Sequence, residues 1–107
     1  LLIEGGAKVN LVNEDGTSPL MAASQNGHNS IVSLLIEKGA DVDLIDLIAR
    51  SPLIIASQNG HELVVSLLIE GGAKVNLVNE DGISALNFAQ NMKHHGVVEL
   101  LLENDAK

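Results

Sequence analysis

The chain has 107 residues, of which 46% are hydrophobic, with one aromatic residue, Phe88, and no cysteine. This length fits one domain, and the hydrophobic content suffices for a core built from Leu, Ile, Val and Ala. The formal net charge of −8 disfavours nucleic-acid binding, which needs a face rich in Lys and Arg. Without cysteine, the chain has no disulfide, thiolate nucleophile or zinc ribbon. Its apolar runs are shorter than the roughly 20 residues of a membrane helix, so we expect no membrane partner.

The sequence repeats itself at a fixed spacing. Residues Leu1 to Gly16 are identical to residues Leu67 to Gly82, at a spacing of 66, which is twice 33. Related segments begin at Leu34 and Leu100, in the same register. Four registers that agree without an insertion indicate a repeat protein, in which each unit packs on its neighbours. The identity of the two sixteen-residue copies indicates a recent duplication or a consensus design.

Each unit carries start and stop signals for two helices. Ser18-Pro19 and Ser51-Pro52 predict helix starts, because serine caps free N–H groups and proline needs no donor at the first position. Asn-Gly pairs predict where these helices stop. We expect first helices over Pro19–Gln25 and Pro52–Gln58, second helices over Asn29–Lys38 and Glu62–Glu70, and extended segments over Val9–Val12, Val42–Ile45 and Val75–Val78.

Turn sequences before the first helices predict three projecting fingers. The first and third are both Asn-Glu-Asp-Gly, at residues 13–16 and 79–82, with glycine at the position that needs positive φ. The middle one is Asp46-Leu47-Ile48-Ala49, followed by Arg50. If Ala49 keeps the positive φ of the glycine that it replaces, the cost is about 1 kcal/mol.

A helix–turn–helix unit of this period, with a projecting turn, resembles the ankyrin repeat. The T-P-L-H-x-A motif of that family occurs at residues 18–23, 51–56 and 84–89, with Met21, Ile54 and Asn87 in place of its histidine. The G-H pair that opens the second helix occurs as residues 27–28 and 60–61, and the L-L-x-x-x-G-A-x-V ending begins at residues 1, 34 and 67. The resemblance implies an all-α repeat solenoid of stacked helix-turn-helix units with projecting short β-hairpin fingers.

The same resemblance divides the chain into parts of one ankyrin-repeat domain. We expect a partial repeat over residues 1–12, repeats over 13–45 and 46–78, and an incomplete repeat over 79–107. The last repeat departs from the pattern, with Lys93 in place of glycine, Gly96 inside the second helix and Asp105 in place of the closing glycine. Because both ends depart from a complete unit, we expect either an excerpt of a longer array or an array whose end units are altered.

The histidines and carboxylates do not form the patterns of a metal or catalytic site. His28, His61 and His94 occupy the G-H position, where the ring ties down a neighbouring turn, and His95 points about 100° away from His94 on a helix. The acidic residues Asp41, Asp43 and Asp46 lack the spacing of a calcium loop. Serine-elbow and phosphate-loop motifs are also absent. We therefore expect no enzyme, no metal and no cofactor, and an intracellular, cytoplasmic protein.

The resemblance implies that the finger tips and the exposed side of the first helices line a concave groove that binds a partner protein or peptide. The equivalent positions in the three units are Glu14, Asp15, Thr17, Met21, Gln25 and Asn26; Leu47, Ile48, Arg50, Ile54, Gln58 and Asn59; and Glu80, Asp81, Ile83, Asn87, Asn91 and Met92.

The middle finger suggests the centre of the interface. Leu47, Ile48 and Ile54, edged by Arg50 and flanked by acidic fingers, resemble an apolar centre with a polar rim. The partner would then present basic residues around an apolar anchor. The alternative is a collapsed finger, with Leu47 and Ile48 folded back onto the neighbouring turns.

A different function is a structural spacer. In that hypothesis the array associates with itself end to end through the apolar faces at Leu1-Leu2-Ile3 and Leu100-Leu101-Leu102.

Overall fold

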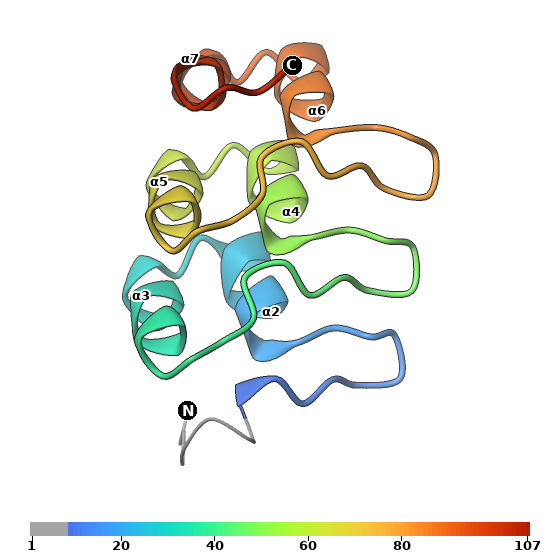
Figure 1. Cartoon of the computed structure of the whole chain (residues 1–107), viewed down its shortest axis with the longest axis vertical. Coiled ribbons are helices and arrows are strands. Elements are labelled where there is room, and N and C mark those ends of the chain that lie inside the picture. The colour runs from blue at the N-terminus through green and yellow to red at the C-terminus, as the bar shows by residue number, and fades with distance from the viewer. Residues whose placement is uncertain (1–8) are drawn as a thin grey trace.

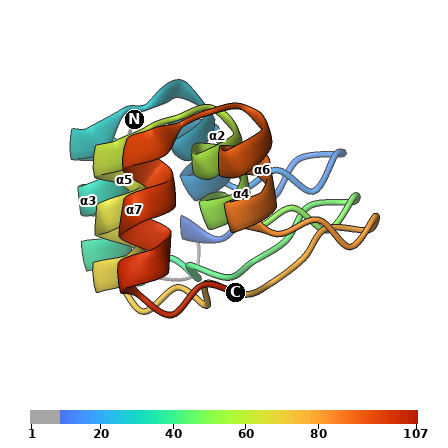
Figure 2. The same ribbon diagram turned by 90° about the horizontal axis from the view of Figure 1, so that it is seen from above.

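The structure, a computed structural model, describes residues 9–107, and within them it has six helices in three pairs. The pairs are α2 (Pro19–Asn26) with α3 (Asn29–Glu37), α4 (Pro52–Gln58) with α5 (Glu62–Glu70), and α6 (Ala85–Asn91) with α7 (His95–Glu103). Figure 1 shows the first helices, α2, α4 and α6, in one column and the second helices, α3, α5 and α7, in another. Figure 2 shows that the helices of each column overlie one another. The predicted all-α repeat fold is confirmed, and the four predicted helices are correct to within one residue at each end.

Each first helix begins where a serine caps it. The Oγ atoms of Ser18, Ser51 and Ser84 accept a hydrogen bond from the backbone N–H three residues later, each at 3.2 Å. Such a bond satisfies one of the N–H groups that a helix leaves free at its start. Directly after α2, Gly27 has a φ of 68° and ends the helix in the left-handed conformation.

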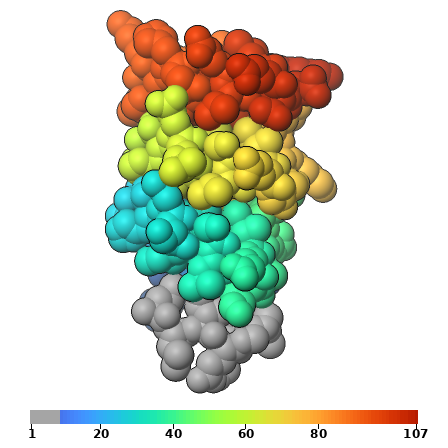
Figure 3. Space-filling model, turned by 90° about the vertical axis from the view of Figure 1, so that its left-hand side faces the viewer, coloured from blue at the N-terminus to red at the C-terminus, as the bar shows by residue number. Residues whose placement is uncertain are grey.

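The core lies between the layers of the stack. Helix α4 packs against α2 on one side and α6 on the other, so every residue from Pro52 to Ser57 is buried. In the outer column, Val64, Val65 and Leu68 of α5 are buried between α3 and α7. Figure 3, seen from the side of the second helices, shows the units as successive layers. The core cluster is aliphatic, with Phe88 partly buried against it, as the composition predicts.

Side chains also join each unit to the next at the turn after the second helix. Three equivalent side-chain oxygens, one in each of three successive turns, accept a backbone N–H from the corresponding turn of the following unit. These bonds run from Asp41 N to Asn10 Oδ1 at 2.8 Å, from Lys74 N to Asp43 Oδ1 at 2.9 Å, and from Lys107 N to Asn76 Oδ1 at 2.9 Å. They tie the turn of each unit to the turn of the next.

The predicted β-hairpin fingers are not confirmed. Within residues 9–107 the fingers are loops, and the structure has one isolated antiparallel bridge there, between Val78 and Ser84. The predicted extended segments are also wrong at their starts, because residue 9 is helical and residues 10, 42–43 and 75–76 lie in turns. The Asp43 N–H donates to Asp41 Oδ1 at 3.0 Å, which bends the chain where a strand would need it straight.

Three non-glycine residues keep the positive φ of the glycines that they replace. Ala49, Lys93 and Asp105 have φ values of 62°, 60° and 70°. This conformation is costly for residues with a Cβ, so the stacking of the units holds the backbone against the local preference. Gly96 lies inside α7, as predicted.

The ends of the chain bear on the spacer hypothesis. The predicted partial repeat at residues 1–12 falls mostly on residues 1–8, including Leu1-Leu2-Ile3, which lie outside the described residues. At the other end, Leu101 is fully buried, Leu100 is half-buried and Leu102 is exposed. These three leucines therefore do not form one exposed apolar face.

Replacing Ala49 with glycine should stabilise the fold. Ala49→Gly removes the Cβ from a left-handed position, and we expect the free energy of unfolding to rise by about 1 kcal/mol. The matched reverse change is Gly82→Ala, where φ is 76° and no described atom lies within 4 Å of the added Cβ. Gly82→Ala should lower the free energy of unfolding by a similar amount, because only the left-handed backbone conformation opposes the added Cβ. Urea denaturation of both variants checks this, and equal stability of Ala49→Gly and the parent chain would contradict it.

The histidines at the G-H position bind the preceding unit. His61 Nε2 lies 2.9 Å from the carbonyl oxygen of Gln25, and His94 Nε2 lies 3.1 Å from that of Gln58. The third histidine of this set, His28, is exposed and its side chain has no hydrogen bond within residues 9–107. The structure thus joins α2 to the second unit and α4 to the third through an imidazole.

His61→Ala should weaken the stack much more than His28→Ala. Loss of the His61 imidazole leaves the Gln25 carbonyl without this partner, and we expect a loss of about 1–2 kcal/mol of unfolding free energy. His28→Ala removes the same atoms from an exposed site and should cost less than about 0.5 kcal/mol. Thermal and urea denaturation measure both losses. Equal losses for the two variants would show that the bond between His61 and the Gln25 carbonyl does not contribute to stability.

Candidate functional site

The three fingers lie side by side and are joined through their backbones. The Leu47 N–H donates to the Asp15 carbonyl at 3.2 Å, and the Glu80 N–H donates to the Ile48 carbonyl at 3.1 Å. At Gly16 the fingers come so close that an added Cβ would lie 3.1 Å from the Leu47 nitrogen. The fingers therefore form one continuous surface beside the first helices, on the side away from the second helices (Figure 1).

The same side-chain turn closes every finger. The first residue of each turn sequence, Asn or Asp, accepts the backbone N–H groups two and four residues later through its Oδ1. The distances are 2.9 and 3.0 Å at Asn13, 3.1 and 2.8 Å at Asp46, and 2.9 and 2.9 Å at Asn79. Because one side-chain oxygen closes the turn, the tip residues between these bonds can vary without changing its shape.

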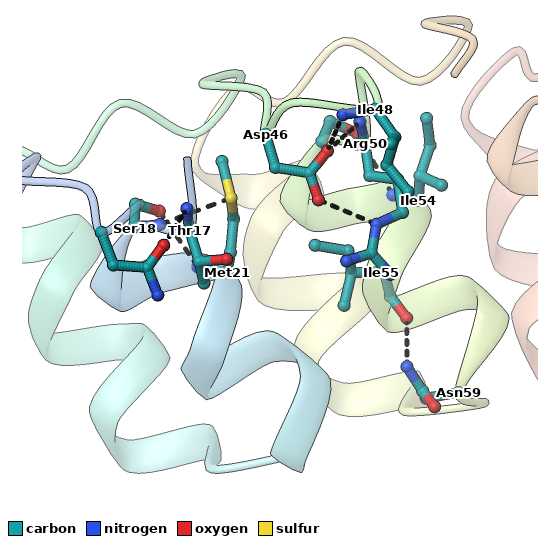
Figure 4. Close-up of polar contacts among 11 residues, drawn as sticks. Thr17, Ser18, Met21, Asp46, Ile48, Arg50, Ile54, Ile55 and Asn59 are labelled. Atoms are coloured by element: carbon teal, nitrogen blue, oxygen red, sulfur yellow. Dashed lines mark hydrogen bonds and ion pairs between the residues drawn. The ribbon is translucent and has the colours of Figure 1, made fainter. Parts of the chain in front are cut away.

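The middle finger has an additional ion pair. Arg50 Nε donates to Asp46 Oδ2 at 2.9 Å, and the Asp46 side chain is 4% exposed. Figure 4 shows the Asp46 carboxylate pointing at Ile48 and Arg50, with both oxygens in use. Both oxygens of the Asp46 carboxylate therefore bond within the finger, and the Arg50 guanidinium is held at the edge of the tip. Arg50 was predicted at the site from the sequence, but this ion pair was not.

The tip of the middle finger presents its apolar residues to solvent. Leu47 is 73% exposed and Ile48 is 44% exposed. The alternative of a collapsed finger is therefore wrong for this structure. The physical reason is that Leu47 and Ile48 use their backbone groups to bind the first and third fingers, which holds their side chains outward.

A cavity of about 350 Å³ lies between the first and middle fingers. Its walls come from both fingers and from the end of α2, and they include seven residues, namely Asp15, Thr17, Gln25, Asp46, Leu47, Ile48 and Arg50. Six of these seven are predicted partner-binding residues from two different units. The cavity combines two aliphatic side chains, one guanidinium and one exposed carboxylate, that of Asp15.

Two of the predicted groove residues are not at the surface, so their assignment is corrected. Met21 and Ile54 are each 1% exposed. Met21 turns back onto its helix start, where its Sδ accepts the Ser18 N–H at 3.4 Å (Figure 4). Ile54 belongs to the core, because α4 is covered on both sides. The equivalent residue of the last unit, Asn87, is exposed.

The remaining predicted residues are mostly at the surface. Nine of them are exposed, namely Glu14, Asp15, Gln25, Asn26, Asn59, Glu80, Asp81, Asn91 and Met92, while Thr17, Gln58 and Ile83 are half-buried. Two amides are already in use, because the Nδ2 atoms of Asn26 and Asn59 donate to carbonyls of their own helices at 2.9 and 2.8 Å. One N–H group and the oxygen of each amide are left to bind a partner.

An apolar row on the fingers was not predicted from the sequence. Val12, Ile45 and Val78 occupy equivalent positions in successive units and are about half exposed, at 50%, 49% and 49%. The signal was available, since all three end the predicted extended segments. They were not recognised because apolar residues in such a segment are ordinarily expected to be buried.

The described residues hold neither a metal cluster nor a membrane-spanning helix. In residues 9–107, no group of three or more His, Asp or Glu side chains could hold a metal ion. The helices of that range are also too short to cross a membrane.

Comparison with known proteins agrees with the geometry. A family model described as ankyrin repeats, in three copies, matches residues 1–79 and 40–107. No curated protein matches the chain. Ankyrin repeats are generally protein–protein interaction modules. The two matches span the whole sequence, and with its stacked helix pairs and projecting fingers this chain belongs to the ankyrin-repeat family.

Proposed function

We propose that this chain binds a partner protein or peptide through the concave surface of its finger tips and first helices, without catalysis. The observation that carries the proposal is the cavity between the first and middle fingers, with Leu47 and Ile48 exposed at its wall. A volume of about 350 Å³ is near the lower end of ligand sites, which suits one or two partner side chains rather than a cofactor.

The apolar centre supplies most of the affinity in this proposal. The backbone of the tip is already hydrogen-bonded, so a partner that covers Leu47 orders the side chain but does not have to order the loop. Covering Leu47 and Ile48 is worth about 2 kcal/mol or more, which corresponds to about 30-fold in affinity. The ion pair of Arg50 with Asp46 keeps a cation at the edge of the anchor site, where its other N–H groups can donate to a partner carbonyl.

The acidic tips supply attraction over a longer range. Glu14, Asp15, Glu80 and Asp81 are exposed on both sides of the apolar centre. A partner with Lys or Arg around an aliphatic residue would be drawn in by this charge and would then bury the aliphatic residue against Leu47.

Placing charge at the apolar centre should weaken binding strongly. We expect a random peptide library displayed on phage to yield peptides that combine an aliphatic residue with Lys or Arg. The double variant Leu47→Asp with Ile48→Asp should bind them about 30-fold more weakly or worse, by calorimetry. Leu63→Asp is the matched control, because Leu63 is 55% exposed on α5, away from the fingers. A correctly folded double variant with unchanged affinity would refute the apolar centre.

Binding should also depend on salt through the finger tips. Raising the ionic strength from about 0.05 to 0.5 M should slow association of the selected peptides about tenfold. Replacing the four acidic tip residues with Gln or Asn should remove the salt dependence of the association rate. The control variant Glu99→Gln with Glu103→Gln on α7 should keep that salt dependence. Stopped-flow kinetics measures both. Association that is indifferent to salt in the parent chain would exclude electrostatic attraction by the tips.

A further inference from the structure

The apolar row of Val12, Ile45 and Val78 crosses the three fingers, one residue from each. Each of these residues stands directly before the Asn or Asp whose Oδ1 closes the turn. Their exposed fractions agree closely, at 50%, 49% and 49%. Because the same turn closes every finger and the units stack (Figure 1), the three side chains point the same way along the stack. The cavity between the first and middle fingers is lined by other residues, so the row is a separate apolar feature.

The stacking of the units sets the spacing of the row. The first helices pack directly on one another, α2 on α4 and α4 on α6, and packed helices lie about 8–10 Å apart. The fingers lead to a similar spacing. Each finger has an outgoing and a returning segment joined by a backbone hydrogen bond, and neighbouring fingers are joined in the same way. Two such steps of about 4.8 Å make about 10 Å per unit.

A polyproline II chain matches this spacing with every third residue. It rises about 3.1 Å per residue with three residues per turn, so residues i, i+3 and i+6 point the same way about 9.3 Å apart. A β-strand turns every second residue to one side, about 6.7 Å apart, and would run out of step with the row.

An α-helix matches the row less well. It returns to the same face after seven residues, or about 10.5 Å, so it drifts by roughly 2 Å over three units and needs about 15 residues to make three contacts. A helix of that length is marginally stable in water, whereas polyproline II is a major conformer of unfolded chains. The extended chain therefore pays less to become ordered on the row.

The charge around the row indicates the residues between the aliphatic ones. The carboxylates of Glu14, Asp15, Glu80 and Asp81 are exposed on the same fingers, so Lys or Arg in the occupant would be attracted there. A second copy of this chain is disfavoured, because it would bring its own acidic tips and its own net charge of −8 to the surface.

We propose that the apolar row binds an extended segment of the partner in the polyproline II conformation, with an aliphatic residue at every third position and basic residues between. One aliphatic side chain packs on each of Val12, Ile45 and Val78. The inference rests on the proposed function, since it assigns the backbone form and the residue spacing of the partner that the finger surface binds.

Synthetic peptides of one composition test the spacing. The first peptide is Leu-Pro-Lys repeated three times, with leucine at every third position. The second contains the same nine residues with leucine at every second position, so its charge is unchanged. The third is a Lys-containing helical peptide with leucine at every seventh position. By calorimetry with the full chain, we expect the first peptide to bind about tenfold more tightly than either of the others.

Threonine at the row removes apolar contact and keeps the β-branched shape. The triple variant Val12→Thr, Ile45→Thr and Val78→Thr should weaken the first peptide about tenfold and abolish its advantage over the second. Leu63→Thr with Leu102→Thr is the matched control, because both leucines are exposed on the second helices. Thermal denaturation checks that the triple variant is folded. If it is not, the single variant Ile45→Thr, with a smaller expected loss, takes its place.

Three results would overturn the proposal. The first is equal affinity for the two nine-residue peptides, or no binding of either. The second is tighter binding of the helical peptide. The third is an unchanged affinity of the folded threonine variant. The proposed function is tested separately by the library-selected peptides. If these still lose affinity with Leu47→Asp and Ile48→Asp, only the row is wrong, and if they do not, the proposed function fails as well.

Discussion

The packing of first helix on first helix is the constraint on which the rest of the structure depends. Helices of seven to nine residues are too short to be stable alone in water, so each forms because its neighbours cover it. Helix α4 shows this most fully, since α2 and α6 bury it on both sides. The left-handed backbone at Ala49 and Lys93 is a consequence, because the stack keeps a conformation that the side chain disfavours.

The stacking of the helices fixes where the fingers lie, but it does not determine which residues occupy the finger tips. One Asn or Asp oxygen closes each turn, and single backbone bonds join Asp15 to Leu47 and Ile48 to Glu80. The middle tip could therefore exchange acidic residues for Leu47 and Ile48 while keeping the same shape. A finger can therefore change its tip residues, and with them the partners it could bind, without changing its backbone shape. Here Leu47 and Ile48 in place of two acidic residues make the middle tip apolar.

The repeat period and the capping residues were enough to predict the helices, because serine, proline and glycine fix helix ends through contacts with the nearby backbone. Burial of Met21 and Ile54 was not predictable in that way, since it depends on which neighbouring element covers a given helix face. The absence of hairpins among residues 9–107 has a similar origin, because side-chain turns and bonds between fingers replace a strand ladder. The pair of Arg50 with Asp46 was missed because a spacing of four residues in a loop does not predict a contact.

In the proposed function, the finger groove is the surface that contacts the partner. Cross-saturation NMR with a selected peptide on the methyl-labelled chain tests this most directly, because it reports which side chains the peptide touches. We expect saturation transfer to Leu47, Ile48 and Thr17, with little at Leu63 and Leu102 on the outer helices. Transfer confined to Leu63 and Leu102, with Leu47 unaffected, would contradict it.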